Sequence, residues 1–202
     1  MIVRPYGDTA VLVEPDDPAT VLALREAVAD VAGVLEAVPA ARTLLVRFDP
    51  AVATAATVRA ALDGALAAAR SRPPEPSVAV ELAVRYDGAD LDAVAAEVGC
   101  SVAALIERHT AAEYTVAFCG FSPGFAYLSG LEPALQVARL ASPRTSVPAG
   151  SVAIAGEFTG VYPRSSPGGW RLLGRTDADL WDLRRTPPAL LAPGTRVRFR
   201  PR

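Results

Sequence analysis

The stretch from residue 71 to residue 76, Ser-Arg-Pro-Pro-Glu-Pro, constrains the fold of this chain more than any other feature. Proline fixes its own φ angle and has no amide hydrogen, so this stretch cannot continue a helix and favours an extended connector. A chain of 202 residues is long enough for one large domain or two small ones. We therefore expect two domains, residues 1–76 and residues 77–202.

The residues before the connector alternate between strand and helix patterns. Residues 10–13 form a short apolar run, and from Pro18 to Gly33 apolar residues recur every three or four positions, as in an amphipathic helix. Residues 43–48 alternate like a strand, and residues 54–70 repeat the helical pattern. Two strand-plus-helix passes favour a small α+β domain of ferredoxin-like type.

After the connector the pattern becomes that of a barrel. Apolar residues alternate from Val78 to Tyr86, as in a strand with one buried face. One helical stretch follows at residues 90–110, and from Thr115 onward short apolar runs are separated by glycine and proline. Short strands with tight turns favour an antiparallel sheet closed into a barrel, so the whole chain is predicted to be α+β.

Composition and charge exclude several classes of protein. Hydrophobic residues make up 51% of the chain, which rules out intrinsic disorder. The net charge is −2 and all basic residues are arginine, which does not suit nucleic-acid binding. A helix-turn-helix spacing at Ala95, Gly99 and Leu105 lies in an acidic stretch, so we assign it to packing on the barrel. Two cysteines and one histidine are too few for a zinc site, and we expect no protein-bound metal.

Several signatures that would define an autonomous enzyme or a membrane protein are missing from the sequence. Without lysine the chain cannot form a phosphate-binding P-loop, and it contains no Gly-x-Ser-x-Gly nucleophile elbow. It has no secretion signal and no apolar run of about 20 residues, so we expect a cytoplasmic protein that does not cross a membrane. The lack of a complete catalytic set points to a site shared with another protein.

Glycine, proline and aromatic residues gather in three segments, at 118–128, 142–152 and 156–170. The first is either an aromatic turn within the barrel core or a ligand site, because glycine permits close approach of a ligand to the backbone. In the second, Arg144 lies on a stiff segment and could bind a carboxylate or phosphate. Gly150 and Ser151 could offer N–H groups to an anion. The alternative is a solvated arginine on a rigid loop. His109 ends the helical stretch and is either a helix cap or a catalytic residue.

These segments resemble the PxpB family of 5-oxoprolinase components, also known as the KipI family or allophanate hydrolase subunit 1. The resemblance is carried by Arg-His-Thr at 108–110, Gly-Phe-Ser-Pro-Gly-Phe-Ala-Tyr-Leu at 120–128, Val-Pro-Ala-Gly-Ser-Val at 147–152 and Ser-Pro-Gly-Gly-Trp at 166–170. It implies a ferredoxin-like N-terminal domain followed by a cyclophilin-like β-barrel C-terminal domain. It also implies a hydrolase that opens 5-oxo-L-proline to L-glutamate with ATP, active only in complex with two further components, PxpC (KipA-like) and PxpA.

The residues that the resemblance assigns to the site fall into two groups. His109 would assist proton transfer and Arg144 would hold an anionic group, while the others would shape a substrate- or nucleotide-binding pocket at the interface with PxpC: Tyr114, Phe121, Pro123, Gly124, Tyr127, Gly150, Ser151 and Gly156. Two alternatives remain open. One is a KipI-type inhibitor of a histidine kinase, and the other is a carboxyltransferase component related to biotin-dependent urea carboxylase.

Overall fold

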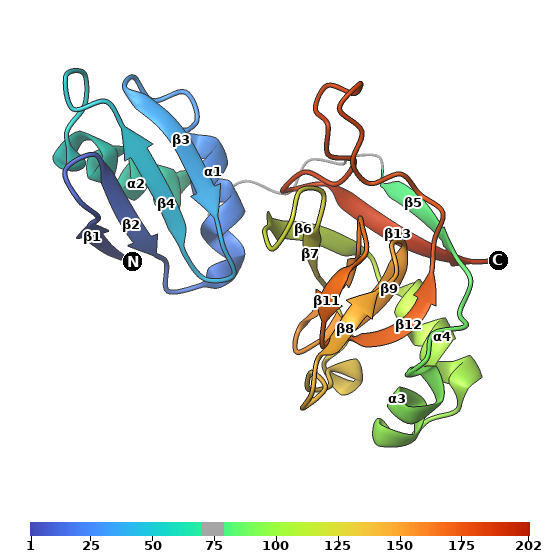
Figure 1. Ribbon diagram of the computed structural model, residues 1–202. Helices are drawn as coiled ribbons and strands as arrows, with labels where there is room; N and C mark the ends of the chain where they lie inside the picture. Colours follow the sequence, from blue (N-terminus) through green and yellow to red (C-terminus); the bar gives the residue numbers. More distant parts are fainter. Residues whose placement is uncertain (70–78) are drawn as a thin grey trace. The chain divides into compact units, whose positions relative to one another are not determined.

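The computed structural model describes residues 1–69 and 79–202, and the chain divides into two compact units, Met1–Pro76 and Ser77–Arg202 (Figure 1). The extended connector predicted at 71–76 lies outside the described residues. The mixed helix and strand content agrees with the predicted α+β class.

The first unit is a four-stranded antiparallel sheet with two helices, in the strand order β1-β2-β4-β3. Its elements are β1 (Ile2–Pro5), β2 (Ala10–Glu14), the 3₁₀ turn η1 (Pro18–Thr20), α1 (Val21–Val28), β3 (Val34–Pro39), β4 (Leu44–Phe48) and α2 (Ala55–Ala69). The helix begins at Val21 because the Asp17 carboxylate accepts a hydrogen bond from Ala19 N–H and caps a 3₁₀ turn there. Strands β1 and β3 were not predicted.

One face of this sheet forms the core of the first unit together with the helices. Leu44, Val46 and Phe48 alternate inward from β4 and pack with residues of both helices, among them Leu24 and Leu62. Each fully buried side chain of this size contributes about 1.5–3 kcal/mol of hydrophobic stabilisation. The first unit therefore has its own core.

The second unit is built on a seven-stranded sheet in the order β12-β9-β10-β7-β6-β13-β5. These strands are β5 (Val80–Val84), β6 (Tyr114–Cys119), β7 (Ala126–Ser129), β9 (Ser151–Ala155), β10 (Phe158–Val161), β12 (Arg171–Arg175) and β13 (Arg196–Pro201). Only β13 and β5 are parallel. Beyond β5 the chain pairs with β12, since Arg85 and Arg175 exchange two backbone hydrogen bonds of 2.9 and 2.8 Å. The two edges of the sheet are thus joined, and the predicted barrel is nearly closed.

Two helices and a short ribbon complete the second unit. The single helical stretch predicted at 90–110 is two helices, α3 (Leu91–Glu97) and α4 (Val102–Ala111), because Gly99 takes a left-handed φ of 70° and Ser101 caps α4 through Ala104 N–H. Their buried residues Val94 and Leu105 belong to the barrel core. The turn η2 (Pro133–Leu135) precedes β8 (Arg144–Val147), which pairs with β11 (Ser166–Gly168) in a separate two-stranded sheet.

The barrel sheet is covered on both faces where β9 runs. Val152 and Ile154 point into the barrel core, whereas Ala153 and Ala155 belong to a second cluster with Tyr162 and other aromatic residues. All five residues of β9 are therefore buried. The finer assignments, ferredoxin-like for the first unit and cyclophilin-like for the second, stay predictions.

Candidate functional site

Loops that are far apart in the sequence meet at one end of the barrel, which we call the loop end: residues 120–125, 148–150, 162–165 and 176–191. Gly150 N–H donates to Tyr162 C=O over 2.7 Å, and Tyr162 N–H donates to Ser151 C=O over 2.9 Å. A Cβ on Gly124 would lie 2.9 Å from the Cβ of Trp181 and 3.2 Å from that of Pro163. The glycines here permit backbone contacts that larger residues would block.

Phe121 occupies a strained backbone conformation at the loop end. Its φ of 65° makes it the one non-glycine residue with positive φ in the described part of the chain, and its side chain is 60% exposed. Ser122 N–H donates to Gly120 C=O over 2.7 Å, which closes a three-residue turn of the rare strained kind. Such a conformation costs on the order of 1–3 kcal/mol and is typical of functional positions.

A cluster of aromatic rings supports Phe121 from behind. Its ring meets Phe125 edge-on at 5.4 Å, and Phe125 meets Tyr162 at 5.2 Å and Trp170 at 5.4 Å. Tyr127 continues the cluster, stacking on the half-buried Phe118 at 4.2 Å. Each such pair adds about 0.5–1.5 kcal/mol of stabilisation beyond the burial of apolar area, so these rings hold the loop in place.

Arg144 lies at the start of β8 with only half of its guanidinium engaged. Its Nη2 donates to Asp90 Oδ1 over 2.7 Å, and the other Asp90 oxygen accepts Leu172 N–H over 2.7 Å. Its Nη1 is buried and has no hydrogen-bond partner within residues 1–69 and 79–202. This buried nitrogen lacks an acceptor, which the predicted anion-binding role would supply.

Tyr162 lies close to Arg144, and Ser166 belongs to β11, the strand that pairs with the β8 strand of Arg144. Arg144 pairs with Gly168 across the ribbon, and a Cβ on Gly168 would lie 2.3 Å from the Tyr162 hydroxyl. Ser166 lies two residues before Gly168 in β11. Its hydroxyl is also buried without a partner in the described structure. Burial raises the pKa of Tyr162, so its hydroxyl stays protonated. We call Arg144, Tyr162 and Ser166 the ribbon cluster.

His109 lies inside the barrel and not at the loop end. Its ring is fully buried and stacks on Phe199 at 4.8 Å. Burial lowers its pKa from 6.5 to about 3, so the ring is neutral at pH 7. The predicted role as a cationic helix cap is therefore wrong. Proton transfer by this buried ring stays a prediction.

The hydrogen bonds around His109 fix its tautomer. Thr159 donates its only hydroxyl hydrogen to Ala153 C=O over 3.1 Å, so it must accept from His109 Nε2 over 3.1 Å. His109 Nδ1 is then the acceptor for the Tyr86 hydroxyl at 2.8 Å. The backbone oxygen of His109 accepts from the buried Tyr114 hydroxyl over 2.8 Å, which places Tyr114 in the same core network.

The structure brings only some of the predicted site residues together. Phe121, Pro123, Gly124 and Gly150 lie at the loop end, and Ser151 follows directly as the first residue of β9. The N–H groups of Gly150 and Ser151 already donate to Tyr162 and Pro148 C=O, so they do not face an anion in this structure. Gly156 lies at the other end of β9, in the turn to β10, where its N–H donates to Val137 C=O.

Sequence reasoning missed several residues of this region. Tyr162 and Ser166 were part of a glycine- and proline-rich segment, but no single signal marked them as polar neighbours of Arg144. Trp181 and Leu183 stand among charged residues in a stretch that reads as an ordinary loop. Their exposure, 38% and 79%, becomes visible only in the folded chain.

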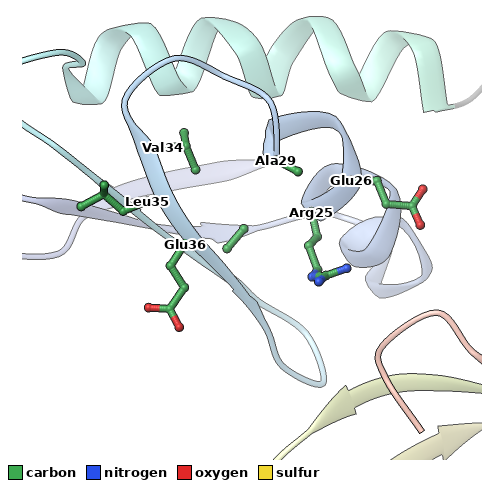
Figure 2. A pocket seen from close by; sticks show the side chains of 7 residues that line it. Arg25, Glu26, Ala29, Val34, Leu35 and Glu36 are labelled. Atoms are coloured by element: carbon green, nitrogen blue, oxygen red, sulfur yellow. The ribbon is translucent and has the colours of Figure 1, made fainter. Parts of the chain in front are cut away.

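A separate hollow of about 320 Å³ lies on the first unit, between α1 and β3 (Figure 2). Side chains of both charges line it, including Arg25, Glu26 and Glu36, beside the exposed Leu35. None of the predicted site residues lies there. Within the described residues no group of His, Cys, Asp or Glu side chains could hold a metal ion, and no helix is long and apolar enough to span a membrane.

The fold and the site define a β-barrel protein that has a strained aromatic loop and a half-engaged arginine. Comparison with known families narrows this class: the family model "Carboxyltransferase domain, subdomain C and D" matches residues 1–191, and the chain belongs to that family.

Proteins named as the B subunit of 5-oxoprolinase are similar to this chain in sequence. The one from Escherichia coli O157:H7 is 41% identical over 206 residues, covering 96% of this chain and 93% of that protein. The one from Bacillus subtilis is 46% identical over 123 residues, covering 59% of this chain and 51% of that protein. The predicted resemblance to the PxpB family is confirmed.

Solved structures agree with this placement. TTHA0988 superposes with a TM-score of 0.81 at 38% identity, covering 96% of this chain and 40% of that chain. This chain therefore spans two fifths of the length of TTHA0988. PH0987 from Pyrococcus horikoshii is 35% identical with a TM-score of 0.59, and the match covers 100% of this chain and 97% of that chain. The urea carboxylase of Kluyveromyces lactis, at 21% identity and a TM-score of 0.64, shares the fold alone.

Proposed function

We propose that this chain is the PxpB component of an ATP-dependent 5-oxoprolinase, which opens 5-oxo-L-proline to L-glutamate together with PxpA and PxpC. The observation that carries the proposal is the 41% identity to the E. coli relative over nearly the full length of both chains. The word "subunit" in the name of that relative implies partners, and ATP is used by the assembled enzyme. We propose further that the complex works in the cytoplasm.

The structure supports a shared site, because its functional features are incomplete on their own. The ribbon cluster offers a guanidinium nitrogen without an acceptor and two hydroxyls, and these groups suit a carboxylate or a phosphate. Both kinds of anion belong to the reaction, since 5-oxoproline carries a carboxylate and ATP carries phosphates. In this proposal Arg144 holds one of them while a partner protein supplies the remaining groups. Any proton that His109 exchanges with a substrate would pass through the hydroxyl of Tyr86 or Thr159, because these two hydroxyls occupy both ring nitrogens.

The proposal includes the finer fold assignments. In the first unit β2 and β3 lie on either side of β4, and α1 connects β2 to β3. This is the arrangement of a ferredoxin-like sheet in which one edge strand, here β1, comes first in the chain instead of last. In the second unit the nearly closed sheet supports a cyclophilin-like barrel. Superposition on the TTHA0988 structure tests both assignments.

Biotin-dependent carboxyl transfer is the second candidate, favoured by the description of the matching family. The two functions differ in their products. Deleting the coding sequence in its host should cause 5-oxoproline to accumulate, because the ring is no longer opened, and re-expression should restore the normal level. Unchanged 5-oxoproline together with loss of a biotin-dependent carboxylation would favour the second candidate instead.

Arg144→Ala tests the ribbon cluster. We expect turnover of the assembled enzyme to fall at least tenfold while its components stay associated, because the anion loses its charged partner. Arg171→Ala is the matched control: Arg171 also forms an ion pair, at 2.6 Å to Glu97, but lies outside the cluster. Steady-state kinetics and size-exclusion chromatography measure both effects. Full turnover in Arg144→Ala would remove the assigned role.

A further inference from the structure

We infer that the loop end docks the companion protein PxpC through three exposed apolar side chains, Phe121, Trp181 and Leu183, which we call the docking triad. The inference rests on the proposed function, since it takes PxpC as the occupant. It assigns Phe121 to contact with a partner protein and not with the substrate.

The first observation is where the exposed apolar side chains lie. Among the described residues of the second unit, 79–202, the large hydrophobic side chains that are exposed are those of the triad, at 60%, 38% and 79%. Single exposed apolar residues are ordinary on protein surfaces. Here they occur on two segments that touch, because a Cβ on Gly124 would lie 2.9 Å from the Cβ of Trp181 and 3.3 Å from Leu180 C=O.

The second observation is that both segments are held rigid before any partner binds. Trp181 and Ala189 form a β-bridge, and Leu190 N–H and Asp182 N–H donate to Leu180 and Pro188 C=O over 3.0 and 3.1 Å. The hairpin 180–191 projects from the barrel as the orange-red loop in Figure 1. Phe121 is fixed by its closed three-residue turn. Rigid side chains lose little entropy on binding, which favours tight docking.

The third observation is that the charged side chains of the hairpin are engaged within the hairpin and its base. Arg184 donates to both carboxylate oxygens of Asp182, at 2.9 and 3.0 Å. Arg185 Nη2 donates to Asp179 C=O over 2.8 Å and to Pro188 C=O over 3.3 Å. These contacts hold the charged side chains in place and leave an exposed aromatic and aliphatic surface beside them. It matches the apolar centre of a protein interface, where aromatic residues dominate.

The fourth observation identifies the occupant. The solved TTHA0988 chain contains the equivalent of this chain in 40% of its length, so more than half of that polypeptide is further chain covalently attached to the equivalent part. The E. coli relative, which this chain covers to 93%, is named as one component of a larger enzyme. A companion chain is therefore the neighbour expected at an apolar and rigid surface. The backbone strain at Phe121 supports this, because glycine would fit φ 65° with less strain.

The test measures binding of purified PxpC, encoded in the same genome, by isothermal titration calorimetry. Leu183→Asp introduces a charge at the tip, and Phe121→Gly removes the ring while suiting the left-handed backbone. We expect each to weaken binding at least tenfold with a melting temperature close to that of the wild type. Val52→Asp is the control, since Val52 is 62% exposed on the first unit and should leave binding unchanged.

The outcomes separate this inference from the proposed function. Recovery of wild-type turnover by both variants at saturating PxpC would support docking, because assembly alone was impaired. Wild-type affinity in both variants within an active complex would overturn the triad and leave the function standing. If the two variants lost self-association or vesicle binding but still bound PxpC, the assignment of the triad to PxpC would also be overturned. A wild-type chain that neither binds PxpC nor supports glutamate release would overturn both.

Discussion

At the scale of single residues, His109 shows how burial decides what a titratable group can do. The sequence marks it as the one histidine of the chain, with an ordinary pKa near neutrality. The fold encloses the ring between Tyr86, Thr159 and Phe199, and the loss of hydration lowers its pKa to about 3. Hydrogen bonds on both ring nitrogens then make it a structural element of the barrel core.

His109→Phe should lower the free energy of unfolding at pH 7 by about 1–3 kcal/mol for each partner left unsatisfied. Below pH 6.5 the unfolded wild type gains a proton that the folded chain does not bind until its pKa of about 3. Wild-type stability therefore falls with decreasing pH in this window, by about 1.4 kcal/mol per pH unit at most. The variant lacks this contribution.

Denaturant unfolding of both chains at pH 7 and pH 5 measures the difference. We expect the gap between wild type and His109→Phe to narrow by about 2 kcal/mol at pH 5. Other ionisable groups affect both chains alike. Parallel pH profiles would show that the ring is not held neutral in the folded state.

Single residues also mark the limit of prediction for the site. The glycine and proline pattern around Phe121 predicted an unusual turn, and the structure has one, because such residues report directly on local backbone geometry. The unpartnered nitrogen of Arg144 could not be predicted. It depends on Asp90, which lies 54 residues away, and on the pairing of β8 with β11.

At the scale of elements, sequence patterns were reliable where one face of an element is buried. The strand at 43–48 and the helix from 54 onward follow this rule and are present as β4 and α2. Strands β1 and β3 were missed because they are edge strands with mostly exposed residues, so they lack the alternation of a half-buried strand. In β8 and β11 neighbouring prolines hide the strand pattern.

The division between α3 and α4 gives a prediction at this scale. Ser101 accepts a hydrogen bond from Ala104 N–H over 3.1 Å at the start of α4. Ser101→Ala should lower the free energy of unfolding by about 1 kcal/mol, because one amide at the helix start loses its partner. Ser101→Asp should retain most of the stability. Thermal unfolding measures both; equal melting temperatures for wild type and the alanine variant would contradict the cap.

At the scale of the whole molecule, the described part of the chain combines binding features without a complete catalytic set. In our proposals the ribbon cluster binds an anion and the docking triad binds a partner protein. The relationship to proteins named as one component of 5-oxoprolinase gives both features a common purpose. The central claim is that this chain forms part of an active enzyme only when it is assembled with its partner proteins.

The most direct measurement of that claim is a titration. Purified PxpA and PxpC are held at fixed concentration with ATP and 5-oxoproline, and glutamate release is followed as this chain is added. We predict no release without the chain, and a rate that rises with its concentration and then saturates as the complex fills. Glutamate formed at the same rate with the chain absent or present would contradict the account.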